Sequence, residues 1–192
     1  ITYNAAISAC EKVKHLDKAL ALFSGMQQQG LTPTVITYSA VISACEKGKE
    51  PERAWELFQD MQQQALKPNL ITCNAAISAC EKGEQPKRAL ELFQGMQQQR
   101  LTPNIITYNA AISACDGTHS EHVLELLMEM RRADLEPDSF TCSAAIRACE
   151  KAGRLAKVSA LLEEMGNGGV RLGHLARSTH GLGTRRALMD VL

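Results

Sequence analysis

Two rows of short polar side chains recur along this chain at a fixed spacing. The first row consists of Asn4, Ser39, Asn74, Asn109 and Ser143. The second row consists of Thr34, Asn69, Asn104 and Asp138. Amide, hydroxyl and carboxylate heads of this size can hydrogen-bond the Watson–Crick edge of a nucleobase. The same residue types also favour helix N-termini and turns, so the residues alone leave both interpretations open.

The spacing of the two rows comes from an internal repeat of 35 residues. The string ITYNAAISAC occupies residues 1–10 and returns unchanged at 106–115, with close variants at 36–45 and 71–80. We predict repeats at 1–34 (truncated at its start), 35–69, 70–104, 105–138 and 139–173, followed by a tail at 174–192. The fourth repeat is one residue short near Asp116–Glu121, and the fifth degenerates at its end. The tail fits no repeat and is interpreted as a possible capping helix.

Each repeat has the pattern of two helices. In the second repeat, one helical face has the spacing i, i+3, i+4, i+7 that is typical of a buried face. It consists of Tyr38, Val41, Ile42 and Cys45. Gly48 is predicted to end this helix, and Pro51 suits the first turn of the next. One pair of short helices cannot bury both of its apolar faces alone, so neighbouring pairs must stack. The sequence therefore predicts an all-α solenoid of antiparallel helix pairs.

Composition excludes several classes of protein. The 192 residues carry 21 basic and 21 acidic side chains, which argues against binding nucleic acid through bulk charge alone. Aromatic residues make up only 4%, so any surface that stacks on bases must be largely aliphatic. No apolar run approaches the roughly 18 residues of a membrane-spanning helix. The seven cysteines follow the repeat and include no Cys-x-x-Cys pair, so we interpret them as small buried apolar residues in a reducing compartment.

The remaining motifs predict neither catalysis nor a cofactor. No nucleophile is accompanied by a base and an orienting group, so we predict that the chain is not an enzyme. His119 and His122 lack a convincing third and fourth ligand nearby and are interpreted as a surface pair, so no metal is expected.

The repeats closely resemble pentatricopeptide repeats over about residues 1–165. The shared features are the 35-residue period, the opening I-T-Y-N, the second-helix pattern A-L-E-L-F-x-x-M and the ending L-x-P-N/D. The Trp-x-x-Leu-Gly opening of tetratricopeptide repeats is absent. The resemblance implies a right-handed superhelix that binds single-stranded RNA with one nucleotide per repeat. The alternative is a helical scaffold that binds proteins without contacting RNA.

The resemblance also implies where such a chain acts. Members of the family process, stabilise, edit or translate RNA in the mitochondrion or plastid, sometimes with other proteins of an RNA-processing complex. We expect no membrane and no small-molecule substrate as partners. The sequence begins inside a helix with no targeting peptide, so it is interpreted as a fragment.

The resemblance assigns a role to each row of residues. The two polar rows match the positions that read the base. A third row matches the position that sandwiches each base between adjacent repeats, and consists of Ile1, Ile36, Ile71, Ile106 and Phe140. A fourth row matches the position near the phosphate backbone, and consists of Lys12, Lys47, Lys82 and Lys151. From the residues alone, the apolar row could equally be core, and the lysines complement helix dipoles.

Family pairings also imply a base for each repeat, with the RNA running 5′ to 3′ along the chain. Asn4 with Thr34 implies a pyrimidine, Ser39 with Asn69 adenine, Asn74 with Asn104 cytosine, and Asn109 with Asp138 uracil. Ser143 stays unassigned because its partner position holds Gly173.

Overall fold

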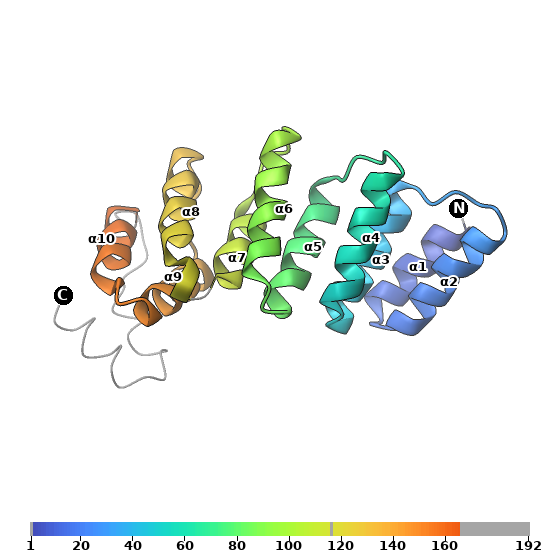
Figure 1. Ribbon diagram of the computed structural model, residues 1–192, viewed down its shortest axis with the longest axis horizontal. Helices are drawn as coiled ribbons and strands as arrows, with labels where there is room; N and C mark the ends of the chain where they lie inside the picture. The colour runs from blue at the N-terminus through green and yellow to red at the C-terminus, as the bar shows by residue number, and fades with distance from the viewer. Residues whose placement is uncertain (1, 116, 166–192) are drawn as a thin grey trace. The chain divides into compact units, whose positions relative to one another are not determined.

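The computed structural model describes residues 2–115 and 117–165, and Ile1, Asp116 and residues 166–192 lie outside them. The described residues form ten α-helices and one 3-10 helix, with no strand among them (Figure 1). Gly173 and the predicted capping helix therefore lie outside the described part of the chain. The chain divides into two compact units, residues 1–103 and 104–192. Within the described segments, no helix combines the length and the hydrophobicity needed to cross a membrane.

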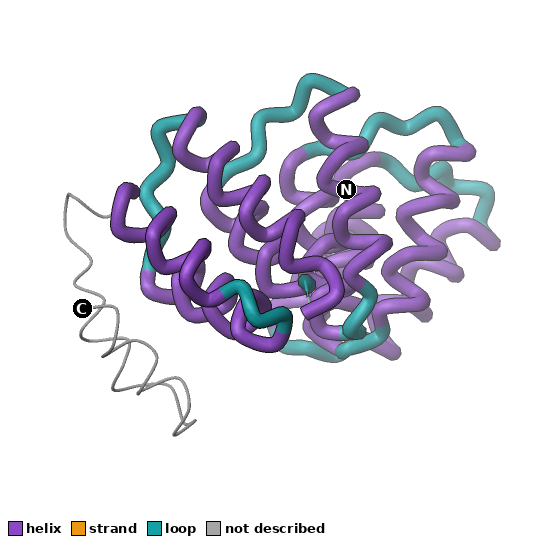
Figure 2. The backbone as a smooth tube through the Cα atoms, turned by 60° about the vertical axis from the view of Figure 1, so that its left-hand side comes forward, coloured by secondary structure: helices purple, strands orange, loops and turns teal. Residues whose placement is uncertain are grey.

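The first unit holds three helix pairs. Its helices are α1 (Thr2–Lys12), α2 (Leu16–Gln28), α3 (Val35–Gly48), α4 (Pro51–Gln63), α5 (Leu70–Lys82) and α6 (Pro86–Gln98). The first helices form one layer, in which α3 lies between α1 and α5 (Figure 1). Each second helix packs on the first helix of its own pair, and α2 and α4 also contact the first helix of the next pair. Figure 2 shows the loops that join consecutive helices at their ends. This is the stacking that the apolar faces require.

The second unit holds two helix pairs. It consists of α7 (Ile105–Ala114), a 3-10 turn (Gly117–His119), α8 (Ser120–Arg132), α9 (Ser139–Lys151) and α10 (Leu155–Met165). Helix α7 packs on α9, α8 contacts both, and α10 packs on α9 and α8. Helix α7 has 10 residues, against 14 in α3 and 13 in α5. The fourth repeat therefore accommodates its missing residue by ending α7 early, at Ala114. The N-terminal end of α7 has the same N-cap hydrogen bond as α5.

The predicted apolar faces are buried. Tyr38, Val41, Ile42 and Cys45 have no exposed surface at all. All seven cysteines are free, and each of them except Cys10 is buried. Burial raises the pKa of the Cys45 thiol to about 12, which leaves it protonated and unreactive. The cysteines behave as the small apolar residues that their spacing predicts.

The glycine at the end of α3 has a different role from the one expected of a helix-terminating residue. Helix α3 does end at Gly48, but the left-handed conformation belongs to Lys49, with φ of 59°. A Cβ atom on Gly48 would lie 2.6 Å from Cδ2 of Leu16, and one on Gly83 would lie 2.6 Å from the ring of Pro51. These glycines therefore allow the close approach of neighbouring helices.

Candidate nucleic-acid interface

The second polar row caps the first helices of the repeats. Thr34, Asn69, Asn104 and Asp138 are the N-cap residues of α3, α5, α7 and α9. The side-chain oxygen Oδ1 of Asn69 accepts a hydrogen bond of 2.9 Å from the backbone N–H of Thr72. Oδ1 of Asp138 accepts one of 2.8 Å from the backbone N–H of Thr141. Capping explains the residue types of this row, but it occupies only one side-chain atom of each residue.

The two polar rows meet at the junctions between repeats. In the second unit, Nδ2 of Asn109 donates a hydrogen bond of 3.0 Å to Oδ2 of Asp138. The shortening of α7 therefore leaves this pair in contact. Asn74 belongs to the first unit and Asn104 to the second, so their pairing stays a prediction. Ser143 donates to the carbonyl oxygen of Ser139 at 2.8 Å, and its partner position lies outside the described residues.

A threonine links the two rows where they do not touch directly. Oγ1 of Thr37 donates to Oδ1 of Asn4 at 2.7 Å and accepts from the backbone N–H of Thr34 at 2.9 Å. Oγ1 of Thr72 lies 2.6 Å from Oγ of Ser39 and donates to Oδ1 of Asn69 at 2.9 Å. The side chains predicted to read one base thus belong to one hydrogen-bonded network.

Sequence reasoning missed these threonines. The residue recurs at the third position of α3, α5, α7 and α9, at Thr37, Thr72, Thr107 and Thr141, and all four are completely buried. The signal was present in the constant Thr of the strings ITY, ITC and FTC. It was hidden because a threonine inside an apolar stretch looks like core.

The environment of Asp138 keeps its carboxylate charged. Burial acts to raise the pKa of this carboxyl, but hydrogen bonds from the backbone and hydroxyl of Thr141 and from Asn109 outweigh burial. The pKa of Asp138 therefore lies below the ordinary aspartate value. At neutral pH the fourth repeat presents a carboxylate that only accepts hydrogen bonds.

The apolar row lies on the surface. Ile36, Ile71, Ile106 and Phe140 are 63%, 65%, 57% and 52% exposed. Each is the second residue of its helix and follows the N-cap by two positions. The exposure excludes the interpretation of these four residues as core, and Ile1 lies outside the described residues. At the N-terminal ends of α3, α5, α7 and α9, an exposed apolar side chain thus follows a hydrogen-bonded N-cap by two positions.

Two of the four lysines form ion pairs within the first unit. Lys47 pairs with Glu11, and Lys82 pairs with Glu46, in each case with the first helix of the preceding repeat. Lys12 and Lys151 are exposed. The ion pairs neutralise charge that a phosphate would otherwise meet, so contact between these lysines and phosphate stays a prediction.

The fourth repeat has a glycine where the other repeats have this lysine. A Cβ atom on Gly117 would lie 2.8 Å from Cβ of Lys151, so this position accommodates the end of α9 closely. The rings of His119 and His122 lie 6.1 Å apart. Among the described residues, no group of three or more His, Cys, Asp or Glu side chains could hold a metal ion.

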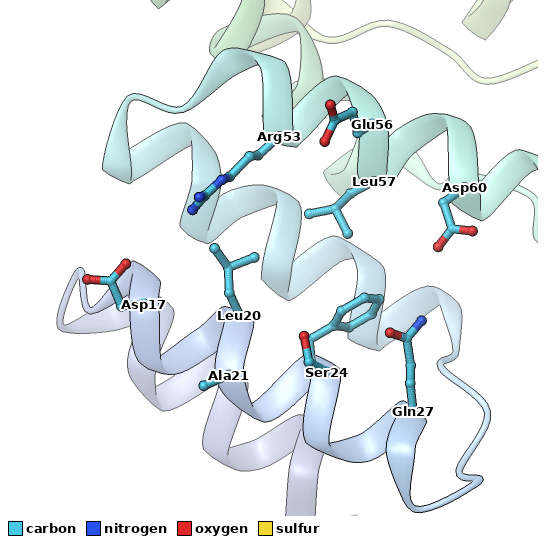
Figure 3. Close-up of a pocket in the computed structure, with 10 residues that line it drawn as sticks. Asp17, Leu20, Ala21, Ser24, Gln27, Arg53, Glu56, Leu57 and Asp60 are labelled. Atoms are coloured by element: carbon cyan, nitrogen blue, oxygen red, sulfur yellow. The ribbon is translucent and has the colours of Figure 1, made fainter.

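A groove lies between the second helices α2 and α4. It is an open groove of about 520 Å³, lined in part by Leu20 and Leu57 (Figure 3). Its charged side chains are Asp17, Arg53, Glu56 and Asp60. Three carboxylates against one guanidinium make this groove unfavourable for phosphate. The charge therefore argues against this groove as a nucleic-acid surface.

Residues 1–172 match the family described as the pentacotripeptide-repeat region of PRORP. The chain belongs to the pentatricopeptide-repeat family. The resemblance seen in the sequence is confirmed. The match extends past residue 165 into the degenerate end of the fifth repeat. No curated protein sequence matches the chain significantly.

Solved pentatricopeptide-repeat structures share the fold. The protein PPR10 in complex with an 18-nt psaJ RNA element is 20% identical, with a TM-score of 0.62 over 98% of this chain and 32% of that one. PPR10 from maize is 24% identical, with a TM-score of 0.64 over 98% of this chain and 28% of that one. The chain thus spans about a third of the length of PPR10.

A third similar structure is the repeat domain of Arabidopsis thaliana protein-only RNase P 1 in complex with tRNA. It is 14% identical, with a TM-score of 0.71 over 96% of this chain and 93% of that domain. Likeness at these identities concerns the fold, and it confirms the predicted α-solenoid.

Proposed function

We propose that this chain binds single-stranded RNA along the N-terminal ends of its first helices, with one nucleotide per repeat. The observation that carries the proposal is the recurrence, from repeat to repeat, of an exposed apolar side chain beside a hydrogen-bonding network. Family membership supports the proposal, as do the RNA complexes of PPR10 and of the RNase P repeat domain.

The chemistry of a nucleobase fits this combination. Every base has an apolar face, and a side chain such as Ile71, which is 65% exposed, gains by being covered. Every base also has an edge of hydrogen-bond donors and acceptors, and these need polar side chains next to the apolar one. The apolar row therefore supplies affinity for any sequence, and the polar networks supply preference among bases.

The fourth repeat gives the clearest preference. Its charged Asp138 accepts the N3–H of uracil and repels the bare N3 acceptor of cytosine. For the other repeats we propose the pairings implied by the family: a pyrimidine for Asn4 with Thr34, adenine for Ser39 with Asn69, and cytosine for Asn74 with Asn104.

The expected affinity is low. Stacking of a base on a side chain contributes about 1–3 kcal/mol, and four or five such contacts must also offset the ordering of the RNA. We expect dissociation constants in the micromolar range or weaker, with strong dependence on salt concentration.

The experiment compares apolar substitutions at two kinds of exposed position. Ile36→Ala and Ile71→Ala remove members of the apolar row, whereas Val13→Ala removes a side chain that is equally exposed, at 62%, in the turn between α1 and α2. Fluorescence anisotropy with a labelled single-stranded RNA should show weaker binding for the first two and unchanged binding for Val13→Ala.

The same titration separates RNA binding from the alternative function. We expect the parent chain to prefer the single strand over an RNA duplex of the same sequence. Equal affinity for the two, or equal loss in all three variants, would favour the protein-binding scaffold.

We also propose that the full protein acts on RNA in mitochondria or plastids, as family membership supports. Imaging of the full reading frame fused to a fluorescent protein tests this location. Fluorescence confined to the cytosol or the nucleus would exclude it.

A further inference from the structure

We infer that the buried threonine at the third position of α3, α5, α7 and α9 is a positioning residue for base reading in the preceding repeat. Thr72 serves the pair Ser39 and Asn69, and Thr141 serves the pair Asn109 and Asp138. The inference rests on the proposed function, because it concerns how the same networks meet a base.

At the junction between the second and third repeats, the hydroxyl protons of Ser39 and Thr72 are both donated within the protein. Oγ of Ser39 lies 2.6 Å from Oγ1 of Thr72 and 2.7 Å from the carbonyl oxygen of Val35. Oγ1 of Thr72 also lies 2.9 Å from Oδ1 of Asn69. Two hydroxyl oxygens at 2.6 Å require one of them to donate to the other.

Both possible arrangements leave Ser39 in the same state. If Thr72 gives its proton to Asn69, Ser39 must give its own proton to Thr72. If Thr72 gives its proton to Ser39, the proton of Ser39 goes to Val35. In either case the proton of Ser39 stays within the protein, so Ser39 offers a ligand only an acceptor lone pair.

Thr72 also fixes the amide of Asn69. The backbone N–H of Thr72 donates to Oδ1 of Asn69 at 2.9 Å, and the hydroxyl oxygen of Thr72 lies 2.9 Å from the same Oδ1. In either arrangement of the hydroxyl protons, the backbone N–H assigns the oxygen of Asn69 to the network and turns Nδ2 away from it. The junction therefore presents one acceptor and one amide donor. Adenine matches this pattern with its N6 amino donor and N1 acceptor, whereas guanine, with O6 and N1–H, presents the reverse.

At the junction between the fourth and fifth repeats, the equivalent threonine is Thr141, and it has different hydrogen-bond partners. The Thr141 hydroxyl donates to Oδ1 of Asn109 and also lies 2.9 Å from Oδ1 of Asp138. The amide nitrogen of Asn109 is thereby directed to Oδ2 of Asp138, at 3.0 Å. What remains for a ligand is a carboxylate lone pair and one N–H, which suits the N3–H and carbonyl of uracil. The threonine is constant, and its variable partners decide the pattern.

The test removes the hydroxyl and keeps the shape. Thr72→Val replaces the hydroxyl by a methyl group, and Thr72→Ser retains the hydroxyl. The readout is the ratio of dissociation constants for two RNAs that differ only at the second nucleotide, adenine against guanine. We expect Thr72→Val to reduce the preference for adenine about fivefold, the value of one neutral hydrogen bond, and Thr72→Ser to keep it.

Two comparisons make the result specific. In Thr72→Val, the preference for uracil over cytosine at the fourth nucleotide should not change. In Thr141→Val, that preference should fall while the preference at the second nucleotide stays. Circular dichroism reports whether each variant folds. If Thr72→Val does not fold, Thr141→Val, which lies in the second unit, tests the same claim.

The outcomes separate this inference from the proposed function. A parent chain that shows no preference at either nucleotide overturns base reading itself. A parent chain that discriminates, together with folded valine variants that keep both ratios, overturns the role of the threonines and leaves RNA binding intact. An equal loss of affinity for all RNAs, with ratios unchanged, also overturns it, because that is the effect of a purely structural residue.

Discussion

The substitution Asp138→Asn tests whether the fourth repeat reads its base. It exchanges one oxygen for an NH2 group at constant size. Oδ1 of Asp138 caps α9 through the backbone N–H of Thr141, at 2.8 Å, and an asparagine oxygen caps a helix equally well. We therefore expect the fold and the stability of the helix to be preserved, so that any change in RNA preference comes from the second side-chain atom.

The magnitude follows from what that second atom contacts. The new amide nitrogen would face Nδ2 of Asn109, which now donates to Oδ2 of Asp138 at 3.0 Å. Two donors cannot share this contact, and the oxygen at position 138 is held by the cap of α9, so the amide of Asn109 must turn over. A hydrogen bond to a charged group is worth about 1.5–3 kcal/mol and a neutral one about 1. The difference of about 0.5–2 kcal/mol means that the preference for uracil over cytosine should fall about two- to thirtyfold and shift toward cytosine.

The assay is a pair of binding curves on two RNAs that differ only at the fourth nucleotide. Asp134→Asn is the matched control, because it removes the same charge from an exposed residue four positions earlier in the same loop. Asp134 has φ of 56°, which asparagine tolerates well. If Asp138→Asn and the parent chain give the same ratio, Asp138 does not read the base.

The same carboxylate sets the pH range of this preference. Because hydrogen bonds hold the pKa of Asp138 below its ordinary value, its favourable contacts are present above that value and are lost as the pH falls through the lowered pKa. The ratio for uracil over cytosine should thus be equal at pH 7 and at about pH 5, where an ordinary aspartate is still mostly ionised. A ratio that falls between these two pH values would contradict the lowered pKa.

Two further predictions concern packing and charge in the first unit. Gly83→Ala should destabilise the fold by about 1–3 kcal/mol, because its Cβ would lie 2.6 Å from the ring of Pro51. Gly95→Ala, with nothing within 4 Å, should stabilise α6 by up to about 1 kcal/mol; urea unfolding measures both, and equal stabilities would refute the packing argument. Glu46→Gln should strengthen RNA binding and steepen its salt dependence, because it frees the charge of Lys82. Titrations at several salt concentrations decide this, and an unchanged slope would remove Lys82 from phosphate binding.

The architecture could be predicted because it depends on features that recur in the sequence. Pro51 and Pro86 stand at the first residues of α4 and α6, where a proline costs no hydrogen bond. The buried face of α3 follows the helical period, and a single pair of such short amphipathic helices cannot bury its apolar residues alone. Even the missing residue of the fourth repeat could be located, although its accommodation by a shortened α7 could not.

The details of the candidate site could not be predicted for a physical reason. A residue type does not say which of its atoms is used. Thr72 inside an apolar stretch could pack through its methyl group or bond through its hydroxyl, and only the position of Ser39 across the junction decides. Likewise, Lys47 at a helix end is equally suited to a phosphate and to Glu11, and the sequence does not show that Glu11 lies within reach.

The two interpretations of the second polar row are compatible, because they use different atoms. In Asp138, Oδ1 caps α9 and Oδ2 faces Asn109, and in Asn69 the oxygen caps α5 while the nitrogen is turned away. Asn, Asp and Thr all supply a capping oxygen, so exchange among them changes the second atom at little cost in stability. Under the proposed function, base preference can therefore change from repeat to repeat without endangering the fold. A scan of stability alone would score these positions as plain helix caps, so binding ratios are needed to test the proposed second role.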